Sequence, residues 1–79
     1  MKVYVKLIAT YREYLPSGTE GNLVTVDVLA GATVEQVLTP FDIPLDDSSV
    51  IVLNGVTVAL DTPLSEGDTV SAFSAIAGG

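Results

Sequence analysis

In two stretches of this sequence every second residue is apolar, so that these residues would share one face of a β-strand. This alternation constrains the fold more than any other feature. The two stretches are residues 3–9 and residues 23–28. The positions that share one apolar face are Val3, Val5 and Leu7 in the first stretch and Val24, Val26 and Val28 in the second. A period of two residues is typical of a β-strand with one buried face. The two stretches are therefore predicted to pair as strands, joined by a loop at residues 16–22, which is rich in turn-forming residues.

One main helix is predicted after these strands. Thr33 and Gln36 have the spacing of a capping box, in which each side chain bonds the backbone of the other residue at a helix start. The apolar positions at helical spacing, which would face the sheet, are Val34, Val37, Leu38 and Phe41. Pro40 is expected to end the helix, because proline lacks a backbone donor and its ring clashes with the preceding turn. A shorter helical turn is expected at residues 10–15.

The second half of the sequence predicts three more strands, at residues 50–53, 56–58 and 69–76. Asn54-Gly55, between the first two of these, is a strong signal for a hairpin turn. The resulting order is strand, strand, helix, strand, strand, strand. This order favours an α+β domain in which one helix packs across a mixed sheet of about five strands, because such packing buries the apolar face of both layers.

The chain is short enough to form a single domain, which we expect to span residues 1–76. The last three residues, Ala77, Gly78 and Gly79, offer almost no side chain to pack. Residues 77–79 are therefore predicted to be a flexible tail.

The charge of the chain excludes some classes of partner. Ten acidic and three basic residues give a net charge of −7. Nucleic acid and anionic membranes both require clustered Lys and Arg, so neither is an expected partner. A positively charged protein is the natural complement, although acidity also serves solubility alone.

No apolar run approaches the roughly 20 residues needed to span a bilayer, and the first residues resemble a strand rather than a signal peptide. We expect a cytoplasmic protein.

The sequence also limits the chemistry that the chain can perform. It contains no Cys and no His, so it has no thiol nucleophile and lacks the commonest general base and metal ligand. Asp42, Asp46 and Asp47 lack the spacing and the glycine of a calcium loop, and we predict that they form a solvated acidic patch. No metal or cofactor is expected to bind to this chain.

Several segments resemble one known family. Residues 8–15 look like the first strand and following turn of MoaD-type proteins, the small subunits of molybdopterin synthase. Residues 53–55, 61–64 and 66–70 are similar to the closing half of the same family. Residues 76–79, Ile-Ala-Gly-Gly, match the C-terminal pattern that MoaD shares with ThiS. The resemblance covers nearly the whole chain and implies a ubiquitin-like β-grasp fold.

The resemblance implies a function for the last residue. In this family of sulfur carriers, the terminal carboxylate, here that of Gly79, is adenylated by a ubiquitin-activating-type enzyme that uses ATP. A sulfur nucleophile then displaces AMP and leaves a thiocarboxylate. Gly78 would keep the tail slim enough to enter the channel of the partner, because glycine has no Cβ. The chain would be a non-catalytic carrier that donates sulfur for molybdopterin biosynthesis together with a larger synthase subunit.

The resemblance also implies a docking surface. Phe73 and Ile8 match an aromatic and an apolar position at which MoaD contacts its partners, and Ile76 and Ala77 belong to the segment that enters the partner. The alternative for Phe73 is ordinary packing in the core. Arg12 matches an arginine of the family and either pairs across an interface or binds an Asp or Glu of its own chain.

Other functions remain open at this stage: a carrier for thiamine thiazole synthesis or for another sulfur-transfer pathway, and a protein of another class. The ending at residues 75–79 also looks like that of ThiS, the carrier for thiamine thiazole synthesis, and Ser74-Ala75 stands where MoaD proteins usually have Pro-Pro. A hypothesis from another class is a ubiquitin-like interaction module or protein tag.

Overall fold

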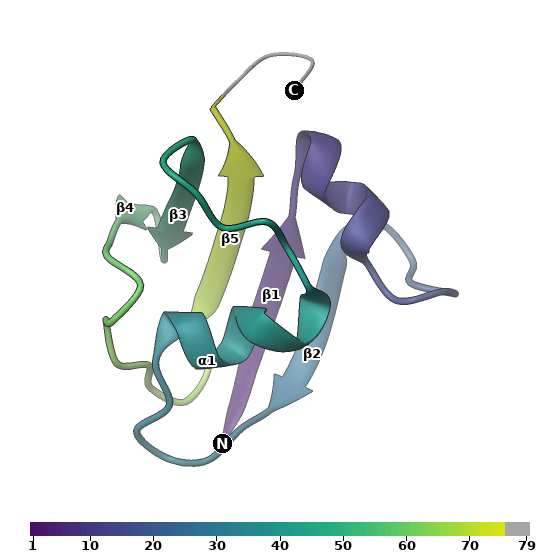
Figure 1. The fold of residues 1–79 in the computed structure, drawn as a ribbon. Coiled ribbons are helices and arrows are strands. Elements are labelled where there is room, and N and C mark those ends of the chain that lie inside the picture. The colour runs from purple at the N-terminus through teal and green to yellow at the C-terminus, as the bar shows by residue number, and fades with distance from the viewer. Residues whose placement is uncertain (76–79) are drawn as a thin grey trace.

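The computed structural model describes residues 1–75 (Figure 1). With η for a 3₁₀ helix, the elements in chain order are β1 (Lys2–Leu7), η1 (Ala9–Tyr14), β2 (Leu23–Asp27), α1 (Val34–Leu38), η2 (Thr39–Phe41), β3 (Ser49–Leu53), β4 (Val56–Thr57) and β5 (Thr69–Ser74). The predicted order is confirmed, and the turn expected at residues 10–15 is η1. The predicted domain end at residue 76 and the predicted tail at 77–79 lie outside the described residues.

The last strand in the sequence, β5, lies in the middle of the sheet. The strand order is β2-β1-β5-β3-β4. β5 is parallel to β1 and antiparallel to β3, whereas β2 and β4 are antiparallel edge strands beside β1 and β3. The predicted β-grasp architecture, a mixed five-stranded sheet with one main helix, is confirmed.

The hydrophobic core lies between the sheet and α1, which crosses one face of the sheet in Figure 1. The fully or almost fully buried residues of β1 and α1 are Val3, Val5, Leu7, Val34, Val37 and Leu38. Val26 of β2 and Val28, just after the end of this strand, are half-buried and pack against this core. β2 buries less than β1 because an edge strand has a neighbour on one side only. The inward positions predicted for the first strand are confirmed. Of those predicted for the second strand, Val26 and Val28 pack against the core, whereas Val24 is half-buried and is not among the residues packed there.

The ends of α1 follow from its capping residues. The amide of Gln36 donates to Thr33 Oγ1 at 3.3 Å, and the amide of Thr33 donates to Gln36 Oε1 at 2.9 Å, so the predicted capping box is present. Pro40 lies in η2, and the chain turns at Asp42, whose φ is 59°. The prediction that Pro40 ends the helix is confirmed, and α1 has only five residues. Phe41 is half-buried against the core.

The hairpin between β3 and β4 turns at the predicted residues. Asn54 and Gly55 have φ values of 50° and 90°, as a tight hairpin turn of two residues requires. Asn54 also fixes the start of β5, because its Oδ1 accepts a hydrogen bond from the amide of Thr69 at 2.9 Å. Its Nδ2 donates to Asp68 Oδ1 at 2.9 Å. A local turn residue therefore joins the hairpin to the central strand.

Across the described part of the chain, no helix has the length and apolar character needed to cross a membrane.

Leu38→Ala should lower the free energy of unfolding by about 2–5 kcal/mol, because it removes a fully buried side chain and leaves a cavity. Leu29→Ala is the matched control, since Leu29 is 85% exposed and its loss should change stability by about 0.5 kcal/mol or less. Urea unfolding of both variants measures the difference. Equal losses in the two variants would contradict the core described above.

Candidate functional site

The predicted tail residues Ile76, Ala77, Gly78 and Gly79 lie outside the described residues. The part of the candidate site that the structure describes is therefore the end of β5, up to Ala75, and the surfaces around it. Two features meet there: the sheet face that α1 does not cover, here called the open face, and a hydrogen-bonded turn at residues 46–49.

Phe73 lies on the open face. Val70 and Ala72 of the same strand are fully buried toward α1, so Phe73, with the opposite parity, points to the other side of the sheet. Its side chain is half-buried and belongs neither to the core cluster nor to the partly buried residues packed against it. Packing of Phe73 in the core is therefore not observed. Its docking role remains a prediction.

Ile8 lies next to Phe73 on the same face. The amide of Ile8 donates to the carbonyl oxygen of Ala72 at 3.0 Å, and the parallel register pairs Leu7 with Ala72. Because Ile8 has an extended backbone, with φ −121° and ψ 153°, the register continues by one position and places it beside Phe73. The structure thus brings together two residues that are far apart in the sequence.

The open face includes two apolar residues that the sequence analysis did not assign to the site. Val50 is directly opposite Phe73 in the antiparallel pair of β3 and β5, and Val52 is opposite Ser71. Both valines are half-buried and lie outside the core cluster. The apolar run at residues 50–53 predicted a strand but gave no signal for which valines face outward, because all four positions are apolar. We define the apolar patch as Ile8, Val50, Val52 and Phe73.

Arg12 does not belong to this patch. It lies in the last turn of η1 and is exposed. Within residues 1–75 no carboxylate lies within 4.0 Å of its guanidinium. The structure therefore does not show the expected alternative in which Arg12 pairs with an acidic residue of its own chain. Its role at an interface remains a prediction.

The turn at residues 46–49 is organised by Asp46. The Asp46 Oδ1 atom accepts hydrogen bonds from the amide of Ser48 at 2.9 Å and from Ser48 Oγ at 2.6 Å. The amide of Asp46 donates to Ser49 Oγ at 3.0 Å. The Ser48 hydroxyl and amide both donate to the Asp46 carboxylate and so favour its charged form. The hydrogen bond from the Ser48 hydroxyl is the main reason that the pKa of Asp46 is lowered. Asp42, Asp46 and Asp47 are all exposed, as predicted. Asp46 also stabilises the turn through its hydrogen bonds, which the sequence did not indicate.

Acidic groups do not gather into a metal site in this region. Across residues 1–75, no three of the Asp and Glu side chains come together in an arrangement that holds a metal ion.

The amide proton of Ser48 should titrate with Asp46, with a midpoint below the ordinary aspartate pKa of 3.8. A lowered folded-state pKa means that the turn is fully stabilised above the ordinary value and loses this contribution as the pH falls through the lower one. The chemical shift of the Ser48 amide should therefore stay constant from neutral pH to about pH 5. In Ser48→Ala the midpoint should rise toward the ordinary value. A wild-type midpoint at or above 3.8 would contradict the assigned hydrogen bonds.

Comparison with known proteins identifies relatives of this fold. The model of the ThiS family matches residues 5–79. A search of curated proteins found no match. Among solved structures, SAMP1 of Haloferax volcanii, a small archaeal modifier protein, is 28% identical with a TM-score of 0.78, and the match covers 100% of both chains.

Two other solved structures are more distant in sequence and show the fold alone. A putative molybdopterin-converting factor subunit 1 from Pyrococcus furiosus is 22% identical with a TM-score of 0.71, and the match covers 95% of this chain and 98% of that one. A complex of subunits 1 and 2 of molybdopterin-converting factor from Helicobacter pylori matches at 18% identity and a TM-score of 0.64, with full coverage of both chains. Because the family model spans nearly the whole sequence, this chain belongs to the ThiS family of ubiquitin-like sulfur carriers.

Proposed function

We propose that this chain carries sulfur as a thiocarboxylate on Gly79. The observation that carries the proposal is the family match, which extends through residue 79 and so includes the terminal Gly78-Gly79.

A free carboxylate is a poor electrophile, because it is negatively charged and has no good leaving group. Attack of the Gly79 carboxylate on the α-phosphate of ATP forms an acyl-adenylate and releases pyrophosphate. A persulfide sulfur of a partner then attacks the carbonyl carbon and releases AMP, and reduction of the resulting acyl disulfide by a thiol leaves the thiocarboxylate.

The partners in this proposal are an adenylating enzyme and a larger subunit that accepts the sulfur. The apolar patch supports such contacts, because half-buried apolar side chains outside a core are typical of protein interfaces. The Helicobacter pylori factor forms a complex of two subunits, which supports a two-subunit synthase for this chain as well. We propose molybdopterin synthesis as the destination of the sulfur, with thiamine thiazole synthesis as the alternative in the same class.

A second candidate function is modification of other proteins. The solved structure that supports it is SAMP1, a modifier protein, which is 28% identical to this chain. A modifier would share the adenylation step, but a lysine amine rather than sulfur would finally attack the Gly79 carbonyl carbon. The two functions therefore differ in the nucleophile and not in the carrier.

Intact-mass measurement tests the proposal directly. The full chain is incubated with ATP, an adenylating enzyme of this family and a persulfide donor with a thiol reductant. The expected product has one oxygen replaced by sulfur at Gly79, and it should deliver that sulfur to a molybdopterin synthase large subunit with its substrate precursor. Isopeptide bonds between Gly79 and lysines would instead favour the modifier function, and a chain that is never adenylated would overturn both.

Gly79→Ala and a one-residue extension after Gly79 should both reduce thiocarboxylate formation by about a hundredfold, because a displaced or bulkier carboxylate loses its reactive alignment. Thermal unfolding should be unchanged, since neither change alters the sequence of residues 1–75, which contain all the described helices and strands. Ser17→Ala, in an exposed loop, is the control and should react at the wild-type rate. Normal thiocarboxylation of the extended chain would show that the terminal position is not the reacting group.

Phe73→Asp should weaken binding to the adenylating enzyme by about thirtyfold or more, as expected for an aromatic residue at the centre of an interface. Its cost in stability should be only about 1 kcal/mol, because Phe73 lies outside the core. Val70→Asp, on the buried side of the same strand, should instead unfold the domain, since it buries an unpaired charge. Binding is measured by calorimetry and stability by urea unfolding. A Phe73→Asp protein that is as unstable as Val70→Asp would place Phe73 in the core.

A further inference from the structure

The end of β5 is held from the β3 side by one backbone hydrogen bond beyond the strand. The register pairs Ser49 with Ser74, and the next position is closed by the Ala75 amide, which donates to the carbonyl oxygen of Ser48 at 2.7 Å. Within residues 1–75, this is the final hydrogen bond between the β3 and β5 sides of the sheet. Its geometry depends on where the turn at residues 46–49 places the carbonyl of Ser48.

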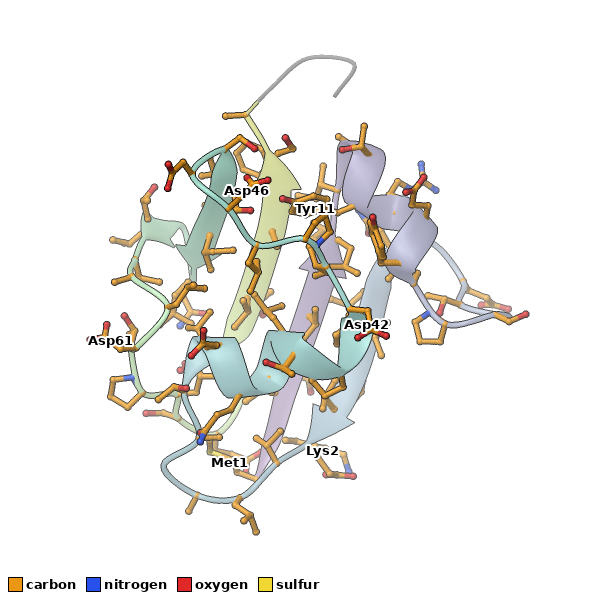
Figure 2. The ribbon with its side chains drawn as sticks, viewed as in Figure 1. Met1, Lys2, Tyr11, Asp42, Asp46 and Asp61 are labelled. Carbon is orange, nitrogen blue, oxygen red and sulfur yellow. The ribbon has the colours of Figure 1, made fainter. Side chains whose placement is uncertain are left out.

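That turn is itself connected to the opposite side of β5. The hydroxyls of Tyr11 and Ser49 share a hydrogen bond of 2.6 Å, although the residues are 38 positions apart in the sequence. Tyr11 belongs to η1, which follows β1, and Ser49 begins β3, whereas β5 lies between β1 and β3. The bond therefore spans the end of β5 on the face that carries α1. Figure 2 labels Tyr11 and Asp46 at this end of the sheet.

The side chain of Tyr11 is held in one position by its surroundings. It is 4% exposed, and its ring meets that of Tyr14 edge to face, with the centroids 6.2 Å apart. Its hydroxyl has a second, more distant contact with the Pro44 carbonyl oxygen at 3.5 Å. Both tyrosines line a pocket of about 260 Å³ together with Asp46, Ser48 and Ser74. A packed ring with a bonded hydroxyl has few alternative positions, so it transmits the position of η1 to the turn.

We propose that Tyr11 is a positioning residue for the reaction at Gly79. Through Ser49 it holds the turn at residues 46–49 across the end of β5, and the Ser48 carbonyl then sets the direction in which the chain leaves the sheet at Ala75. This inference rests on the proposed function, because it concerns delivery of the C-terminal carboxylate to a partner.

The reach of the chain explains why this direction matters. The four residues after Ala75 span at most about 14 Å when fully extended. A partner docked on the apolar patch presents its active site at a fixed place relative to the sheet. A tail that is fully extended in the channel of a partner has no slack, so a displacement at Ala75 would be carried to the reacting carboxylate, and misplacement by about 1 Å is enough to slow a reaction strongly.

Tyr11→Phe tests the proposal because it removes the hydroxyl and keeps the buried ring. Tyr14→Phe is the matched control, since Tyr14 lies in the same 3₁₀ helix and its hydroxyl takes part in none of the hydrogen bonds of the turn. In the free full-length chain, hydrogen exchange of the Ala75 amide, measured by NMR, should be about tenfold faster in Tyr11→Phe and unchanged in Tyr14→Phe. Exchange of the buried strand amide of Val5 serves as the internal reference for global stability.

The catalytic readout is adenylation by an adenylating enzyme, followed as pyrophosphate release. Tyr11→Phe should lower kcat by about three- to tenfold with KM within about twofold of wild type, because the apolar patch is unchanged while the tail is less well directed. Ser49→Ala should lower kcat at least as much, because it also removes the hydrogen bond from the Asp46 amide. In the Ser49→Ala background, Tyr11→Phe should have no further effect, since both remove the same bond.

Equal Ala75 exchange in wild type, Tyr11→Phe and Tyr14→Phe would overturn the proposal. So would faster exchange in Tyr11→Phe with an unchanged kcat, because Tyr11 would then only stabilise the turn. A wild-type chain that is not adenylated would overturn the proposed function, and with it the positioning role of Tyr11 in the reaction. The exchange comparison would still show separately whether Tyr11 holds Ala75.

Discussion

The pairing of β5 between β1 and β3 is the interaction on which the rest of the structure depends. It joins the two halves of the sequence, because β5 is hydrogen-bonded to β1 on one side and to β3 on the other. It buries Val70 and Ala72 beneath α1 and, by the alternation of the strand, turns Phe73 to the open face. The strand that completes the core is thus also the strand that leads to the C-terminus. β5 therefore both completes the core and positions the candidate site.

Most of the fold was predictable because its signals are local. The alternation of Val3, Val5 and Leu7, the Thr33 and Gln36 capping box and the turn at Asn54 each involve a few neighbouring residues, and each is found in the structure. The Phe73 position was also accessible, since parity along one strand requires no knowledge of its neighbours.

The rest of the candidate site could not be predicted because it depends on contacts between distant segments. Val50 joins the apolar patch only through the register of β3 against β5, and an all-apolar run carries no parity signal. The bond between Tyr11 and Ser49 depends on the strand order, which places their elements on opposite sides of β5. Asp46 was correctly expected to be exposed, but its hydrogen bonds with Ser48 depend on the conformation of an irregular turn.

The distribution of charge bears on how a partner would dock on this chain. All three basic residues lie in the first twelve positions, and Lys2 and Lys6 alternate with the buried residues of β1, so they lie on the open face. Lys6 pairs in register with Leu23 and Ser71, so a positive charge lies on the same face as the apolar patch although the net charge of the chain is −7. Long-range attraction to a basic partner increases the rate of encounter, whereas close contact depends on apolar burial and on an acceptor for Lys6. Under the proposed function, affinity would come from the apolar patch and steering from the net charge, so a partner that matched the net charge alone would not fit the open face.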